Sequence, residues 1–378
     1  MASGNELRGL QLQTIATSSG TLKLELVDVA IPSPASDEVL VRVEAAPINP
    51  SDILLLVGTA DLETAQAGGT SDRPTLVCQL PNGGLRSLAA RLDLPLVAGN
   101  EGAGTVISAG SEVGHVLGKR VAMFGGAMYS EFRCLKLSDC MILPDGATAI
   151  EGASSFVNPM TALGMIETMQ LEGHIALVHT AAASSLGQML NRICIKDGID
   201  LVNVVRTTRQ EQMLRDQGAR HVCNSSAETF MTDLIRCVGD TGATIAFDAV
   251  GGGKLAGQLL TAMEASITSG AKVFSPYGSS VHKQVYIYGG LDTGPTQLSR
   301  GFGTTWNIGG WLLFPFLENL DPVRTDNLKA RIAAELKTTF ASHYTREISL
   351  REAVDPQIAA LWNRRATGEK FLIVPTKS

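Results

Sequence analysis

The chain of 378 residues has the length of two packed domains of roughly 100–200 residues each. Its apolar content of 44% and charged content of 18% are typical of a folded globular protein. The net charge of −6 gives no electrostatic signal for binding of nucleic acid or of an anionic membrane surface, so both are excluded as expected partners.

The sequence carries no expected membrane or secretion signal. The longest apolar run, residues 308–317, covers about ten residues, which is too short to span a bilayer. The first residues lack a basic stretch followed by an apolar core, so no secretory signal is expected. The six cysteines are scattered without a CxxC pair, which is typical of reduced thiols, and we predict a cytoplasmic protein.

The first part of the chain, to about residue 150, predicts a small antiparallel β-barrel. Its segments alternate apolar and polar residues or form short strands between glycines, over 22–32, 37–49, 102–110, 118–126 and 129–135. The long connection between Gly58 and Gly99 interrupts this pattern and predicts either a lid over the substrate site or a neutral surface insertion. Within it, residues 85–92 could form a short helix.

A different pattern begins near Glu151. A helix is expected after Pro159, and apolar strands then alternate with helices. The expected strands cover 174–181, 200–207, 221–226, 243–252 and 284–291, and the expected helices cover 184–197, 209–219 and 254–266. Continuously apolar strands separated by helices predict a doubly wound α/β domain with a parallel sheet covered on both faces.

Five motifs occur in the order of one known family. They are "APINPSDILLLVG", "GNEGAGTVISAG", "FVNPMTALG", the α/β block and the ending "TGEKFLIVP". Together they resemble the medium-chain dehydrogenase/reductase superfamily, most strongly its zinc-free quinone oxidoreductases and enoyl-thioester reductases. The resemblance implies a GroES-like β-barrel catalytic domain over 1–154 and 318–378, a Rossmann NADPH-binding domain over 155–317, and a homodimer.

Zinc-binding members of this superfamily use a cysteine, a histidine and a further cysteine or acid as ligands. The corresponding positions here are Asn49, Asn100 and either Val157 or Asn158. An amide oxygen is a poor zinc ligand beside thiolate or imidazole, so no metal site is expected. Glu101 keeps its place in "GNEGAG", where a structural acid bonded to backbone is the preferred interpretation.

The stretch "LVHTAAASSLGQML" lies between an apolar strand and a helix, where a pyrophosphate-binding turn is expected. Small residues replace most of the usual glycines, and Gly187 occupies the position where the helix packs on the strand. The predicted contacts are Ala183, Ser184, Ser185, Leu186 and Gly187, with serine hydroxyls that donate to phosphate or cap the helix. The alternative is a structural turn that binds nothing.

Arg206 follows the next strand, nineteen residues after Gly187, where a carboxylate would bind the ribose hydroxyls of NAD. Arg206 and Arg209 instead offer guanidinium groups suited to a 2′-phosphate, so the predicted cofactor is NADPH. Arg209 alone could equally be a solvated helix residue.

The resemblance implies further contacts near the nicotinamide. They are Thr161, the strand end Tyr288, Gly289 and Gly290, and the next strand end Gly309, Gly310 and Trp311. Asn49, in the vacated zinc-ligand position, is expected to contact the nicotinamide or the substrate.

Without a metal to polarise a carbonyl, a conjugated acceptor suits hydride transfer better than a simple ketone. The leading hypothesis is therefore reduction of a small electrophilic substrate, a quinone, an enone or a similar activated alkene. The related enoyl-thioester reductases place a tyrosine after the "INPSD" motif, but "LLLVGTADLE" has none. Tyr277 is the first candidate for the proton donor, and Asn49 the second catalytic residue. The alternatives are a 2-enoyl-thioester reductase and a non-catalytic NADPH-binding protein.

Overall fold

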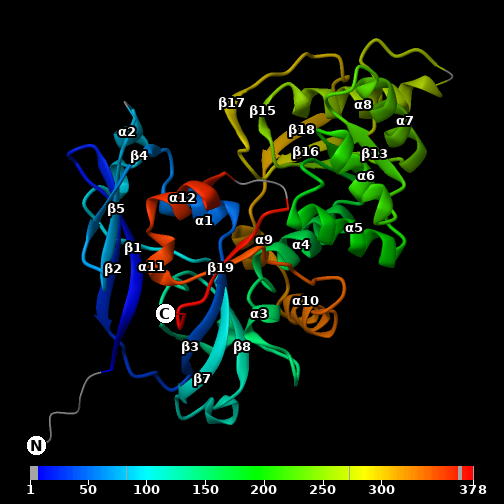
Figure 1. Cartoon of the computed structure of the whole chain (residues 1–378). Coiled ribbons are helices and arrows are strands. Elements are labelled where there is room, and N and C mark those ends of the chain that lie inside the picture. The colour runs from blue at the N-terminus through cyan, green and yellow to red at the C-terminus, as the bar shows by residue number, and fades with distance from the viewer. Residues whose placement is uncertain (1–6, 82, 272, 365–367, 378) are drawn as a thin grey trace, which may run out of the picture. The chain divides into compact units, whose positions relative to one another are not determined.

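A computed structural model describes residues 7–81, 83–271, 273–364 and 368–377, and the chain divides into two units (Figure 1). The first unit contains the described residues up to Val157 and from Lys329 onward, and the second contains Asn158–Leu328. The C-terminal part returns to the first unit because its strand β20 (Phe371–Ile373) pairs with β3 (Glu38–Pro47).

The first unit is built on two sheets with mainly antiparallel pairing. One sheet has the order β4 (Asp61–Gly69), β5 (Pro74–Gln79), β2 (Thr21–Ala30), β1 (Arg8–Ala16) and β6 (Leu96–Val97). The other has the order β10 (Cys140–Ile142), β8 (Arg120–Phe124), β7 (Glu101–Ala109), β3, β20 and β19 (Arg346–Ile348), and β9 (Phe132–Lys136) pairs with β3. Alternating burial along β2 sends its leucines into the core that both sheets enclose.

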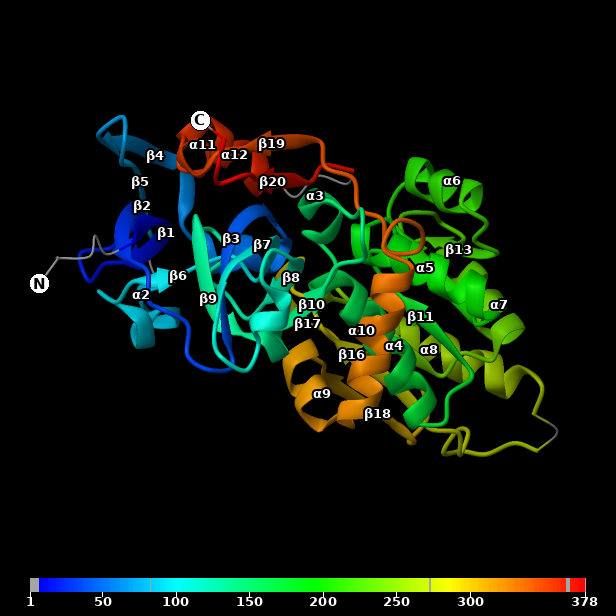
Figure 2. The same cartoon turned by 90° about the horizontal axis from the view of Figure 1, so that it is seen from below.

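Short helices complete this unit. They are α1 (Pro50–Leu56), α2 (Gly84–Ser87), η1 (Ala89–Arg91), η2 (Gly114–Val116), η3 (Leu137–Asp139), α3 (Ala149–Gly152), α11 (Leu350–Ala353) and α12 (Pro356–Asn363). Figure 2 shows the C-terminal elements α11, α12, β19 and β20 gathered together. Helix α10 (Pro322–Ala334) contains the division between the two units.

The long connection between Gly58 and Gly99 is an ordered part of a sheet. It forms the hairpin β4–β5, whose strand β5 pairs with β2, and the short strand β6, which pairs with β1, so the insertion adds strands at both edges of the first sheet. The expected helix over residues 85–92 is broken into α2 and η1. The sequence did not predict the strands of this insertion. Strand β4 consists mainly of exposed polar, alanine and glycine residues, which give no hydrophobic alternation.

The second unit is a parallel sheet with the order β13-β12-β11-β14-β16-β18. This is the 3-2-1-4-5-6 order of doubly wound folds. The strands are β11 (Ala176–His179), β12 (Asp200–Val205), β13 (His221–Asn224), β14 (Ile245–Asp248), β16 (Lys283–Ile287) and β18 (Trp306–Gly310). Strands β11 and β14 are buried at every residue, as a sheet covered on both faces requires.

The helices of this unit connect its strands. They are α4 (Val157–Leu171), α5 (Ser185–Asp197), α6 (Thr208–Asp216), α7 (Phe230–Thr241), α8 (Leu255–Ser269) and α9 (Leu313–Asn319). The sequence interpretation omitted α7 and the small parallel pair β15 (Gly251–Gly253) and β17 (Asp292–Thr296). Among the described residues, no helix is both long and apolar enough to span a membrane.

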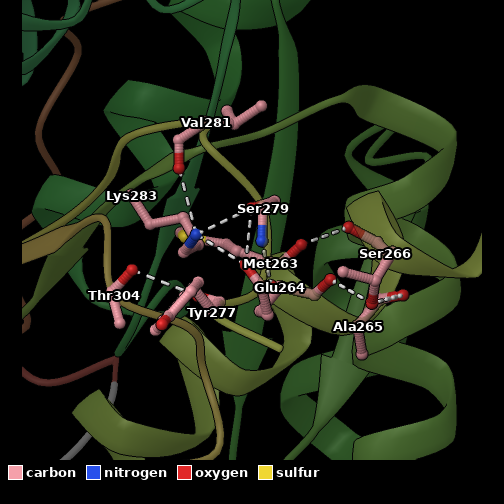
Figure 3. A network of polar contacts seen from close by, with 10 residues as sticks. Met263, Glu264, Ala265, Ser266, Tyr277, Ser279, Val281, Lys283 and Thr304 are labelled. Carbon is pink, nitrogen blue, oxygen red and sulfur yellow. Dashed lines mark hydrogen bonds and ion pairs between the residues drawn. The ribbon is translucent and has the colours of Figure 1, made fainter. Parts of the chain in front are cut away.

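A buried ion pair fixes the segment that leads into β16. Lys283 Nζ lies 2.6 Å from Glu264 Oε2 of α8 and also donates to Ser279 Oγ and to the Val281 carbonyl (Figure 3). Glu264 accepts two further hydrogen bonds, from the amide and the hydroxyl of Ser279. Burial acts to raise the pKa of Glu264, but Lys283 and Ser279 together hold this pKa below its ordinary value.

We predict that Lys283→Met lowers the free energy of unfolding by about 3–5 kcal/mol, because it leaves a buried carboxylate without its counter-charge. The matched change Lys337→Met removes an exposed pair with Glu151 and should cost at most about 1 kcal/mol. Chemical denaturation of both variants measures the difference, and equal losses would contradict the assignment of a structural role to the buried pair.

Candidate functional site

The carboxyl edge of the parallel sheet gathers most of the residues predicted from the sequence. The strand order reverses between β11 and β14, and ligands of such sheets bind outside the strand ends at that point. The predicted cofactor residues lie at the ends of β11, β12, β16 and β18 or in the loops and helix starts that follow. They are Ala183, Ser184, Ser185, Leu186, Gly187, Arg206, Arg209, Tyr288, Gly289, Gly290, Gly309, Gly310 and Trp311. The parallel pairing brings these separate sequence segments to one edge.

The turn from β11 to α5 is held by its own backbone and by Ser184. Ser184 is the N-cap of α5, and its Oγ accepts a hydrogen bond from the Gly187 amide at 3.1 Å. Ala183 and Leu186 are buried, so their side chains pack inside the unit and only their backbone is available to a ligand. Ser185 is exposed in the first helical turn. Of the two predicted serine roles, the structure therefore bears out capping for Ser184.

Gly187 allows the first turn of α5 to lie very close to the turn that follows β11. A Cβ built at Gly187 would lie 2.3 Å from the Ala182 carbonyl oxygen, a distance that no side chain can occupy. This contact is with the turn, so the packing of the helix on the strand at Gly187 stays a prediction. The same turn holds Ala181 at a φ of 51°, in the left-handed region where glycine is favoured. This tight turn leads to a helix N-terminus, which is the arrangement that a pyrophosphate group requires.

Arg206 and Arg209 lie just beyond the end of β12. Both are exposed, and neither guanidinium forms a hydrogen bond or ion pair with another described residue. The Arg206 amide donates to Gln210 Oε1, and Thr207 caps α6, so the loop backbone is fixed while the guanidinium groups stay free. Two unpaired cations at this strand end fit a bound phosphate.

The sequence interpretation missed a buried acid at the point where the strand order reverses. Asp248 at the end of β14 accepts hydrogen bonds from the Thr180 hydroxyl at 2.7 Å and from the amides of Val250 and Gly251. The Thr180 oxygen in turn accepts from the Ala249 amide. Asp248 therefore fixes both loops that border the reversal point. A charged residue directly after a fully apolar strand was the signal that could have identified it.

The ends of β11 and β16 are joined by a side-chain hydrogen bond. His179 Nε2 and Tyr288 Oη are 2.7 Å apart, and burial lowers the pKa of His179 to about 3, so the imidazole is neutral. Gly289 lies close to β14, because a Cβ there would be 2.6 Å from the Ala249 oxygen. The Tyr288 side chain therefore links the carboxyl ends of β11 and β16 through its hydrogen bond with His179.

Two other predicted residues lie in packed surroundings. Trp311 donates from Nε1 to Thr168 Oγ1 at 3.0 Å and meets the ring of Phe247 edge-on. Thr161 lies on α4, seven residues earlier in the same helix, and is buried. The Trp311 side chain thus has a structural role in joining α4 to the end of β18.

Tyr277 lies apart from these residues. It precedes β16, and segments that lead into the strands of a parallel sheet lie at the amino edge, opposite the predicted cofactor residues. Its side chain is 72% exposed, and it lies near the Glu264–Lys283 pair (Figure 3). This placement speaks against Tyr277 as the proton donor. The sequence pattern did not distinguish the two edges of the sheet at this loop.

In the first unit, Asn49 is held by a fully buried carboxylate. Asn49 Nδ2 donates to Glu101 Oε1 at 2.8 Å, and the amides of Phe156 and Val157 donate to Glu101 Oε2. Burial raises the pKa of Glu101, while these hydrogen bonds and the charge of Lys370 act to lower it. The expected structural acid bonded to backbone is confirmed, and it also fixes the Asn49 amide.

Two further ionisable groups surround this pair. Asp52 is fully buried and accepts from the amides of Asn49 and Asn100, and burial raises its pKa to about 7. Lys370 is also buried, with its ammonium group 5.6 Å from the centre of the Tyr344 ring. Burial lowers the pKa of Lys370, and the charges of Glu101 and Asp52 oppose that shift. Within the described part of the chain, no cluster of three or more His, Cys, Asp or Glu residues fits a metal ion.

Comparison with known proteins gives matches over both units. Residues 35–155 match the family model of the alcohol dehydrogenase GroES-like domain. The chain is 32% identical to the mitochondrial enoyl-[acyl-carrier-protein] reductase of Xenopus tropicalis, over 53% of this chain and 51% of that protein. It is 28% identical to a quinone oxidoreductase of Pseudomonas aeruginosa, over 42% of this chain and 50% of that protein. The chain thus spans about half the length of the curated relatives that it matches.

Among solved structures, a protein of Mesorhizobium loti assigned as an NADPH:quinone reductase is similar with a TM-score of 0.72 and 26% identity. The match covers 99% of this chain and 100% of that one. Together with the family model, this match confirms the predicted fold class, a GroES-like β-barrel domain combined with a doubly wound α/β domain.

We predict that Gly187→Ala destabilises the protein by roughly 1–3 kcal/mol, because the added Cβ must push the Ala182 carbonyl away. Gly114→Ala is the matched control, since a Cβ there meets no atom within 4 Å. The control should change stability by at most about 0.5 kcal/mol. Thermal unfolding of both variants checks the contrast, and an unaffected Gly187→Ala protein would refute the close packing.

Proposed function

Because the chain belongs to the medium-chain dehydrogenase/reductase superfamily, we propose that it is an NADPH-dependent reductase of quinones, enones or similar activated alkenes that works without zinc. The observation that carries the proposal is the carboxyl edge of the parallel sheet, where the tight turn at Gly187 and two unpaired arginines occur together. In this proposal the second unit binds the cofactor, and the first unit supplies the catalytic groups.

The residues at that edge have separate roles toward NADPH. The α5 N-terminus and the turn backbone from Ala183 to Gly187 hold the pyrophosphate, and the Ser185 hydroxyl adds a donor. Arg206 and Arg209 bind the 2′-phosphate that distinguishes NADPH from NADH. The strand ends at Tyr288–Gly290 and Gly309–Trp311, with Thr161, border the nicotinamide. When bound, NADPH supplies a hydride to an electron-poor carbon.

The first unit determines which acceptors suit the site. Asn49 presents an amide where zinc enzymes of the superfamily have a thiolate, and its Nδ2 is already bonded to Glu101. An amide in that position supports catalysis without zinc. Without a metal to polarise an isolated carbonyl, an acceptor whose carbon is activated by conjugation fits the proposed chemistry.

A second candidate function is reduction of a 2-enoyl thioester. The relatives named enoyl-[acyl-carrier-protein] reductase favour it, one of them at 32% identity. The absence of a tyrosine from "LLLVGTADLE" weighs against it. A non-catalytic NADPH-binding protein is the remaining alternative. The homodimer and the cytoplasmic location stay predictions, and several of the named relatives are mitochondrial proteins.

We predict that Arg206→Asp weakens NADPH binding at least 10-fold more than NADH binding, because the new carboxylate repels the 2′-phosphate and removes its counter-charge. Arg220→Asp makes the same charge change at an exposed position on the amino side of β13 and should leave both affinities within about 2-fold. Titration of each cofactor by fluorescence or calorimetry measures the ratio. Equal losses for both cofactors would contradict the phosphate assignment.

We expect NADPH oxidation with quinones or enones as acceptors, faster than with enoyl-CoA esters and faster than with NADH. A stopped assay across these three acceptor classes, run with both cofactors, measures the preference. Faster turnover of enoyl-CoA esters would favour the second candidate function. Tight NADPH binding without oxidation by any acceptor would favour the non-catalytic alternative.

A further inference from the structure

Several buried polar atoms in the first unit have no hydrogen-bond partner among the described residues, and two of them, one an acceptor and the other a donor, lie near Glu101. One is Asn49 Oδ1, an acceptor on a residue that is only 2% exposed. The other is Lys370 Nζ, a donor on a residue that is only 7% exposed. Buried polar groups almost always have partners in folded proteins, so a pair of unsatisfied atoms requires an explanation.

The orientation of the Asn49 amide follows from chemistry. The Glu101 carboxylate accepts hydrogen bonds from two backbone amides, and as a carboxylate it offers only acceptors to Asn49. Asn49 must therefore turn its NH2 group toward Glu101, at 2.8 Å, and its oxygen the other way. Glu101 is thus a positioning residue that leaves the Asn49 oxygen free to accept.

Strand pairing brings Lys370 to the same place. β20 pairs with β3 so that Leu372 faces Pro47, and the Ile48 amide donates to the Phe371 carbonyl at 2.9 Å. Asn49 and Lys370 each lie just beyond this pairing, Asn49 as the N-cap of α1 and Lys370 directly before β20. The charge of Lys370 acts on Glu101, the carboxylate that binds the Asn49 side-chain amide. The free acceptor and the free donor therefore lie around the same buried carboxylate.

The other hydroxyl groups in this cluster are already engaged. Tyr129 Oη donates to the Pro47 carbonyl at 2.9 Å, and Tyr344 Oη donates to Ser154 Oγ at 2.9 Å. Burial raises the pKa of both phenols. Asp52 accepts two backbone amides. Of the hydroxyl and ammonium donors among these described residues, the Lys370 ammonium group is the one whose protons have no acceptor in the protein.

Resting on the proposed function, we propose that Lys370 protonates the substrate oxygen after hydride transfer to the conjugated carbon, and that Asn49 Oδ1 accepts the hydrogen bond from the resulting hydroxyl. A carbonyl oxygen accepts from the Lys370 ammonium group before reaction, and the hydroxyl formed from it donates to Asn49. One oxygen atom thus satisfies both unpaired groups. The ligand chemistry is that of a quinone or enone oxygen and of the corresponding hydroquinone or enol.

The proposed step balances in atoms and electrons. The hydride that NADPH supplies forms a C–H bond at the conjugated carbon, and the displaced electron pair becomes a negative charge on the oxygen. One Lys370 N–H bond breaks and one O–H bond forms, which leaves a neutral amine. With an enone the product is the enol; with a quinone, the added ring carbon then loses its proton to solvent and the second oxygen gains one, which gives the hydroquinone. Solvent then returns a proton to Lys370. An ammonium group beside the oxygen stabilises its developing charge in the same position from which it transfers the proton.

The charged groups around Lys370 determine the expected pH dependence. Glu101 from β7 and Asp52 from α1 favour its protonated form, burial disfavours that form, and the Tyr129 and Tyr344 phenols stay neutral. The net effect lowers the pKa of Lys370. Because the acid must be protonated, kcat should be highest below this pKa and should fall as the pH rises through it.

The test compares wild type with Lys370→Met and Lys370→Arg in a kcat–pH profile with the best acceptor. We expect Lys370→Met to lower kcat by about 100-fold or more and to remove the alkaline fall. Lys370→Arg keeps a positive charge that does not dissociate, so it should also lack the alkaline fall, with partial activity. Lys377→Met, an exposed lysine that interacts with Glu347 and Glu352, is the control and should leave kcat and the profile unchanged.

Hydroquinone binding without NADPH, measured by calorimetry, gives a readout besides activity. Lys370→Met and Asn49→Ala should each weaken hydroquinone binding at least 5-fold. Asn49→Ala should leave the binding of 1,4-dimethoxybenzene unchanged, because this ligand has no hydroxyl donor for Asn49 Oδ1. An unchanged kcat–pH profile in Lys370→Met, or unchanged hydroquinone affinity in both variants, would overturn the inference.

The two proposals fail in different ways. If wild type oxidises NADPH with no acceptor, the proposed function fails, while the hydroquinone measurement still tests the paired groups. If wild type is active and Lys370→Met does not fold, Asn49→Ala and the alkaline fall of the wild-type profile decide the question.

Discussion

The parallel pairing of one sheet places the proposed cofactor site. Parallel strands all end at the same edge, so residues that are far apart in sequence, from Ala183 to Trp311, arrive there together. The reversal of strand order between β11 and β14 opens the loops away from each other at that edge. Asp248 then ties both loops to the sheet through Thr180 and two backbone amides. Without this constraint, the tight turn at Gly187 and the arginines after β12 would be unrelated surface features.

In the first unit, the hydrogen bonds of one buried acid orient the candidate site residue. Glu101 accepts hydrogen bonds from two backbone amides and from Asn49 Nδ2, so Oδ1 is the atom of the Asn49 amide that remains available. A carboxylate in this position costs solvation energy, which the three donors offset. The same unit buries Asp52 and Lys370 nearby, so it concentrates titratable groups in an otherwise apolar core. Such clusters are typical of functional sites and less typical of structural ones.

The sequence predicted strands and helices well where hydrophobic periodicity was strong. The apolar strands before the Gly187 turn and before Asp248 were identified, as was α5 with its serine cap. The sequence predicted secondary structure less well in segments without a clear hydrophobic periodicity. Strand β4 of the β4–β5 hairpin consists largely of exposed polar, alanine and glycine residues, and the hairpin joins the sheet because its other strand β5 pairs with β2. Tyr277 was predicted as the proton donor because it lies in an irregular segment before a strand. Hydrophobic periodicity does not show which edge of a sheet such a segment occupies.

The sequence alone determined the fold class, the turn that replaces glycines by alanine and serine, and the exchange of a metal ligand for Asn49. The turn and the exchange at Asn49 are local, because they depend on residue type and spacing within one segment, and the fold class follows from the order of several such segments along the chain. Only the tertiary structure decided which atom of Asn49 is free, that Ala183 and Leu186 are buried, and that the charge of Lys370 acts on the Glu101 carboxylate that binds Asn49. The physical reason is that hydrogen-bond partners and burial depend on contacts between residues distant in sequence. A single segment does not specify those contacts.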